Sequence, residues 1–94
     1  MIKIVKEMDN IIISGHANFS DTNDIVCASV SSIMYTTVNA ILNIDEEAIE
    51  FLDDNNKCTI TIKKHDDITN KLIDNMMILF KELEDKYPSN IKIN

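Results

Sequence analysis

Two long stretches with helical spacing, each preceded by a pair of strand-like segments, constrain the fold of this chain more than any other feature. The first follows Thr22–Asp24, which are residue types favoured at helix N-caps, and is predicted to end near Leu42–Asn43. The second is predicted to begin at Asp66–Asp67 and to be stopped by Pro88. The positions that repeat at this spacing are Val26, Val30, Ile33, Met34, Thr37, Val38 and Ile41, then Ile68, Leu72, Ile73, Met76, Met77, Leu79, Phe80, Leu83 and Tyr87.

The segments before each helical stretch are rich in β-branched residues or alternate between apolar and polar side chains, which predicts strands. Turn signals at Met8–Asn10 and Asp53–Asn56 divide them into two hairpins. The predicted order is β-β-α-β-β-α-β, an α+β fold in which residues 1–94 form a single small domain with a mixed sheet and two helices. The predicted strands are Ile2–Lys6, Ile11–Ser14, Glu46–Leu52, Cys58–Lys63 and, at an edge, Ile91–Ile93.

The size of the chain limits its core and favours self-association. Ninety-four residues with 45% apolar content suit one globular domain whose own core is modest. The second helical stretch is apolar over about twice the width of a single stripe. We expect burial on two sides, against the sheet and against a second subunit, and therefore a homodimer.

The net charge of −7 restricts the partners of the chain. Binding to phosphate backbones requires clustered Lys and Arg, so a direct nucleic-acid partner is not expected. An acidic surface suits a basic protein or peptide partner, although the charge also serves solubility alone. The longest uninterrupted apolar runs are Ile11–Ile13 and Met76–Phe80, and the N-terminus lacks the apolar core of a signal peptide, so we expect no membrane span and a cytoplasmic location.

A histidine and a cysteine occupy positions from which a thiol nucleophile could be built. His16 follows a strand-like segment, and Cys27 is the third or fourth residue of the first helix if Asn23 or Asp24 is its cap. The positive end of a helix and a nearby imidazole both lower a thiol pKa, because the thiolate is the charged form that they stabilise. The N–H groups of the first helical turn are candidate donors for an oxyanion.

Each of these residues also has a purely structural interpretation. Cys27 could be a small buried side chain and His16 a satisfied strand-end residue. Asp24 could only cap the helix, Gly15 could only relieve strain at the strand end, and Phe19 could plug its loop. Zinc binding by His16, Cys27, Cys58 and His65 is disfavoured because their spacing matches no zinc pattern, so no metal or other cofactor is expected.

Two short blocks at a constrained spacing resemble the ribosomal-processing cysteine protease family. The blocks are Gly15-His16-Ala17 and Asp24-Ile25-Val26-Cys27-Ala28, the second followed by Val30-Ser31. The predicted element order and the length also resemble that family, so the likeness extends over essentially the whole chain. Two positions depart from the family pattern: Asn23 stands where a glycine is common, and Ser29 replaces the second alanine after the cysteine.

The resemblance implies a homodimeric cytoplasmic endopeptidase that removes the N-terminal extension of a large-subunit ribosomal protein, with a Cys-His dyad. It implies that Cys27 is the nucleophile and His16 its general base, with Asp24 and Gly15 in supporting positions. The connecting loop resembles the family segment that closes over substrate. The residues of this loop are Asn18, Phe19, Ser20, Asp21, Thr22 and Asn23.

A non-catalytic function remains open from the sequence. An assembly factor that binds a basic ribosomal protein would use the same acidic charge without any nucleophile. Cleavage of a precursor by the native chain distinguishes the two functions, because a binding module yields no product.

Overall fold

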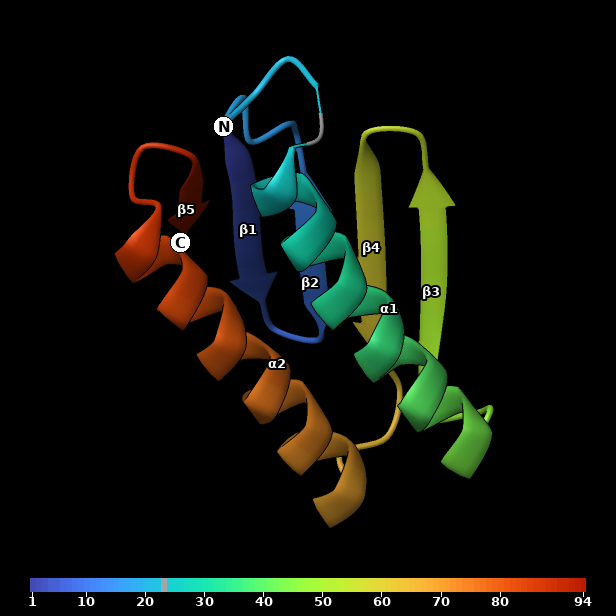
Figure 1. The fold of residues 1–94 in the computed structure, drawn as a ribbon. Coiled ribbons are helices and arrows are strands. Elements are labelled where there is room, and N and C mark those ends of the chain that lie inside the picture. Colours follow the sequence, from blue (N-terminus) through green and yellow to red (C-terminus); the bar gives the residue numbers. More distant parts are fainter. Residues whose placement is uncertain (23) are drawn as a thin grey trace.

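The computed structural model describes residues 1–22 and 24–94 and contains five strands and two helices in the predicted order β-β-α-β-β-α-β (Figure 1). The elements are β1 (Ile2–Glu7), β2 (Asn10–Ser14), α1 (Ile25–Ile44), β3 (Ile49–Asp54), β4 (Lys57–Ile62), α2 (Asp67–Lys86) and β5 (Ile91–Ile93).

The strands form one mixed sheet in the order β3-β4-β2-β1-β5. Strand β1 pairs with β5 in parallel, and every other neighbouring pair is antiparallel. The short strand β5 lies at an edge, as predicted, with Ile91 opposite Ile2. This pairing brings the C-terminal residues beside the start of the chain.

Both helices cover the same face of the sheet, so the molecule has two layers with the core between them (Figure 1). Alternate strand residues such as Ile4, Ile11 and Ile60 point into this core and are fully buried. The α1 residues expected from the helical spacing of the sequence pack in this core. Val26 is fully buried and Ile33 is partly buried. The opposite face of the sheet is not covered by any described element and carries Leu52 at 64% exposure.

Helix α1 meets the length and composition of a membrane-spanning segment. The expectation of no membrane span rested on uninterrupted apolar runs, whereas this criterion also admits α1, which mixes apolar residues with Ser and Thr and contains no charged residue. In the fold, Val26, Val30, Met34, Val38 and Ile41 of α1 are buried. The core helix of a globular domain satisfies the same criterion, so this property does not require a membrane.

Strand β3 begins at Ile49, three residues later than predicted, and the following turn is shorter than predicted because Asp53 and Asp54 belong to the strand. The residues after α1 form a turn instead of a strand. The backbone N–H of Asp45 donates to the carbonyl of Ile41, and that of Ala48 donates to the carbonyl of Asp45. These bonds occupy the backbone that a longer strand would need.

Helix α2 is rotated slightly from the predicted stripe. Its fully buried line runs through Ile73, Met76 and Phe80, whereas Ile68 is 54% exposed. The helix begins where predicted, because the Asp66 side chain accepts a hydrogen bond from the backbone N–H of Thr69 at 2.8 Å. The apolar face identified from the sequence is wide enough for the helix to pack in either of two rotational positions about its axis. Packing against the sheet selects the one that buries Ile73, Met76 and Phe80.

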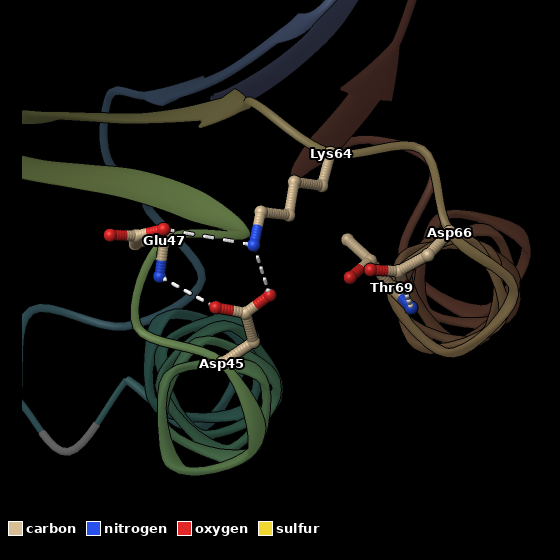
Figure 2. Close-up of polar contacts among 5 residues, drawn as sticks. All are labelled: Asp45, Glu47, Lys64, Asp66 and Thr69. Atoms are coloured by element: carbon tan, nitrogen blue, oxygen red, sulfur yellow. Dashed lines mark hydrogen bonds and ion pairs between the residues drawn. The ribbon is translucent and has the colours of Figure 1, made fainter.

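Figure 2 shows polar contacts where α1 ends and α2 begins. The Asp45 carboxylate pairs with the Lys64 ammonium at 2.8 Å and also accepts from the backbone N–H of Glu47 at 3.0 Å. The hydrogen bond from Lys64 contributes most to holding the pKa of Asp45 below its ordinary value. The folded chain therefore favours the charged form of this carboxylate.

We expect Asp45→Asn to lower Tm at neutral pH, with the difference from the native chain shrinking in acid. Because the folded-state pKa is depressed, the contribution is complete above the unfolded value of about 3.9 and is lost as pH falls through the folded value. Thermal unfolding between pH 7 and pH 2 measures this. Glu47→Gln is the control, since its pair with Lys64 is longer, at 3.8 Å, and more exposed. A Tm difference that stays constant down to pH 2 would contradict the assignment.

Candidate active site

The turn after β2 depends on a glycine. Gly15 has φ of +88°, and a Cβ built there would lie 2.5 Å from the carbonyl oxygen of Met1. Its backbone N–H donates to the carbonyl of Asn56 at 3.0 Å, which ties this turn to the β3–β4 hairpin. Gly15 thus allows the chain to leave the sheet at the point where His16 follows.

We expect Gly15→Ala to reduce the free energy of unfolding by about 1–3 kcal/mol, because it adds both a left-handed backbone penalty and a backbone clash. Urea denaturation measures the change. Asn18→Ala is the control: Asn18 also has a positive φ, of 56°, but already carries a side chain there. A Gly15→Ala chain as stable as the native one would show that the turn relaxes without cost.

Asp24 is the N-cap of α1 and holds the preceding loop as well. One carboxylate oxygen accepts from the N–H groups of Val26 and Cys27, each at 3.0 Å, and the other accepts from the N–H of Phe19 at 3.1 Å. The Cys27 N–H is the largest cause of the lowered pKa of Asp24. With Asp24 as the cap, Cys27 is the third residue of the helix.

The sulfur of Cys27 accepts a hydrogen bond from the segment that follows His16. The backbone N–H of Ala17 donates to Cys27 Sγ at 3.2 Å, and Ala17 itself is 2% exposed. A peptide N–H and the positive end of α1 therefore converge on one partly buried sulfur. Both stabilise negative charge, which is the condition for a reactive thiolate.

The expectation that first-turn N–H groups are free to hold an oxyanion is wrong for three of them. Those of Val26 and Cys27 donate to the Asp24 side chain, and that of Ala28 donates to the Asp24 carbonyl at 3.0 Å. The cap satisfies these donors, as N-caps do. The N–H of Ala17, beside the sulfur, is a donor that sequence spacing did not identify.

His16 and Cys27 line the same cleft, which has a volume of about 200 Å³. The lining residues come from the end of β2, the start of α1 and the β3–β4 hairpin. These three segments lie at the same end of the sheet (Figure 1). His16 is exposed, and the hydrogen bond to the sulfur comes from Ala17 instead of the imidazole. Catalytic hydrogen bonds often tighten only when substrate is bound, so this geometry keeps His16 available as a base.

Tyr35, Asp53 and Cys58 also line the cleft and were not predicted as site residues. The Tyr35 hydroxyl donates to the Asp53 carboxylate, and this bond is the main cause that raises the pKa of Tyr35 to about 12. Burial, and then Asp53, raise the pKa of the Cys58 thiol. Tyr35 could have been found from its position eight residues after Cys27 on the same helix, because positions i and i+8 lie within the same broad helix face.

The loop expected to contact substrate is partly held against the C-terminal segment. The ring of Phe19 packs edge-on against that of Tyr87, with centroids 5.4 Å apart, and Phe19 remains 46% exposed. Asn18 has a left-handed backbone, and the Ser20 hydroxyl donates to the carbonyl of Thr22. Asp21 is exposed, and the expectation for Asn23 lies outside the described residues.

The four residues weighed for zinc binding do not come together. His65 lies 2.8 Å from the Asp9 carboxylate at the β1–β2 turn, whereas His16, Cys27 and Cys58 line the cleft. Among residues 1–22 and 24–94, no three His, Cys, Asp or Glu side chains are grouped to hold a metal ion.

Comparison with known proteins identifies the family of the chain. The family model of cysteine protease Prp matches residues 1–92. Over 92 residues the chain is 28% identical to the ribosomal processing cysteine protease Prp of Staphylococcus aureus, strains Mu50 and NCTC 8325, with 94% of this chain and 87% of the relative covered.

Solved structures of the S. aureus protease have the same fold. The structure with a covalently linked product peptide has a TM-score of 0.86 and 25% identity, and covers 99% of this chain and 95% of that one. The structure with a substrate peptide has a TM-score of 0.81 at 24% identity, with the same coverage. These similarities confirm the α+β fold class predicted from the element order.

Proposed function

Because the chain belongs to the Prp family of cysteine proteases, we propose that it removes the N-terminal extension of a large-subunit ribosomal protein, using Cys27 as nucleophile and His16 as general base. The family match confirms the resemblance found in the sequence and makes the chain a cysteine protease. The name of the S. aureus relative supports a ribosomal substrate, and the net charge of −7 suits a basic one.

One observation carries the assignment of the nucleophile. Cys27 Sγ lies at the N-terminus of α1, accepts the Ala17 N–H at 3.2 Å and shares a cleft with His16. The other cysteine of the cleft, Cys58, is buried, and burial raises the pKa of its thiol, which disfavours the thiolate form. The product peptide linked covalently to the S. aureus protease supports a covalent step in this family.

The proposed reaction proceeds through a thioester. His16 accepts the proton of the Cys27 thiol, and the thiolate attacks the scissile carbonyl carbon. Negative charge moves from the sulfur to the carbonyl oxygen, so the Ala17 N–H that donated to the sulfur can donate to that oxygen instead. The carbonyl re-forms as the C–N bond breaks, and His16 gives its proton to the leaving amine. Water, deprotonated by His16, then hydrolyses the thioester and restores the Cys27 thiol.

The homodimer and the cytoplasmic location remain part of this proposal. Exposed apolar side chains on the outer side of α2, Ile68 at 54% and Ile78 at 60%, are available to a second subunit. Sedimentation at micromolar protein concentration measures the mass, and a monomer there would contradict the dimer. Fractionation of cells expressing the chain tests the location.

Incubation of the native chain with a ribosomal protein precursor tests the function directly. We expect one cleavage that separates the N-terminal extension, identified by the masses of both products. The mature protein, which lacks the extension, is the matched control and should stay intact. Stable binding of the precursor without any product would instead favour the non-catalytic assembly factor.

A further inference from the structure

A side chain from the far end of the sequence contacts the loop that carries the candidate general base. The Asn90 side-chain amide donates to the carbonyl of Ala17 at 2.9 Å, across 73 positions of sequence. Asn90 lies in the turn between α2 and β5, and Ala17 is 2% exposed. A carbonyl in so closed a setting needs a hydrogen-bond donor, and Asn90 supplies it.

Asn90 itself has a fixed position. Its backbone N–H donates to the carbonyl of Tyr87 at 3.0 Å, and its own carbonyl accepts from the N–H of Ile2 at 2.8 Å. The next residue, Ile91, pairs with Ile2 in the sheet and is 1% exposed. Glu84 of α2 accepts from the N–H of Ile93 at 2.7 Å, so β5 is tied to both the sheet and the helix.

The contact completes the restraint of Ala17. Its side chain is in the core, its N–H lies on Cys27 Sγ, and its carbonyl lies on the Asn90 amide. His16 is the preceding residue, so the same restraints limit where the imidazole stands. The edge-on contact of Phe19 with Tyr87 attaches the loop to the same C-terminal segment at a second point.

We infer that Asn90 is a positioning residue for the protease reaction, holding the His16–Ala17 segment against the Cys27 sulfur. This inference rests on the proposed function for the roles of His16 and Cys27. Asn90 touches neither the substrate nor the sulfur and acts through Ala17. Without its amide, the loop loses the restraint that keeps the Ala17 N–H on the sulfur.

The test compares Asn90→Ala and Asn90→Leu with the native chain. Leucine fills a similar volume without a donor, which separates loss of the hydrogen bond from loss of packing. We expect kcat to fall roughly ten- to a hundredfold in both variants while KM changes little, because small misplacements of reacting groups affect the chemical step most. Ser89→Ala, in the same turn but exposed, is the matched control and should keep native kcat.

Alkylation of Cys27 by iodoacetamide provides a readout that general destabilisation would not move. Rates are measured against pH in the Cys58→Ala background, so that Cys27 is the thiol observed. We expect the profile of both Asn90 variants to differ from that of the native chain, because the Ala17 N–H is no longer held on the sulfur.

A native kcat in both variants would overturn the inference. So would a reduced kcat accompanied by an unchanged alkylation profile, since the loss would then come from stability alone. If the native chain cleaves no peptide, the proposed function fails, whereas the alkylation profile still decides whether Asn90 holds the loop on Cys27. The two failures are therefore distinguishable.

Discussion

Cys27→Ala is expected to lower kcat for peptide cleavage by roughly four orders of magnitude or more, because it removes the sulfur on which the proposed thioester forms. The fold should persist, since Cys27 is only partly buried and the Asp24 cap contacts its backbone N–H, which alanine keeps. Cleavage of a fluorogenic peptide spanning the processing site measures kcat, and thermal unfolding confirms that the variant is folded.

Cys58→Ala is the matched control, because it removes the other thiol of the same cleft. Burial and the nearby Asp53 carboxylate raise the pKa of Cys58, which disfavours the thiolate that a nucleophile requires. We expect the Cys58→Ala chain to process the peptide. Persistent cleavage by folded Cys27→Ala would contradict Cys27 as the nucleophile. A complete loss of cleavage in Cys58→Ala alone would transfer that role to Cys58.

Local signals in the sequence predicted those parts of the fold that depend on neighbouring residues. Asp24 was one of three neighbouring cap candidates and Asp66 was placed at the start of the second helix, because the donors that a cap satisfies lie only two or three positions ahead. The alternation of Cys58, Ile60 and Ile62 predicted an inward strand face, and all three are buried. Cys27 was predicted as the third or fourth residue of α1, for a cap at Asp24 or Asn23, and it is the third because Asp24 is the cap.

Features that depend on distant pairing could not be predicted. Strand β3 begins late because Asp45 turns the chain after α1 and Lys64 pairs with its carboxylate, a contact across 19 positions. The Ala17–Asn90 hydrogen bond joins opposite ends of the chain, and Asn90 has no distinguishing sequence context. Likewise, Asp53 reached the cleft through the register of β3 on β4, where it lies opposite Cys58.

The second large effect is expected from Asp24, whose carboxylate restrains both the helix that carries Cys27 and the loop after His16. Asp24→Ala leaves the N–H groups of Val26, Cys27 and Phe19 without their partner. We expect kcat to fall roughly a hundredfold and Tm to decrease, because the first turn of α1 loses its cap and the loop loses its attachment. Peptide cleavage and thermal unfolding measure the two effects.

Asp24→Asn separates the two restraints. An asparagine oxygen can still accept from Val26 and Cys27, so the cap is retained, but its amide cannot accept from the Phe19 N–H. We expect a Tm close to native with kcat between those of the native and Asp24→Ala chains. Because the folded-state pKa of Asp24 is lowered, its stabilising effect is complete at neutral pH and is lost as pH falls through that value, so the Tm deficit of Asp24→Ala should shrink in acid. Equal Tm and kcat values for Asp24→Asn and Asp24→Ala would contradict this separation. The negative charge of Asp24, and not its separate hydrogen bonds to helix and loop, would then account for its effect on stability and activity.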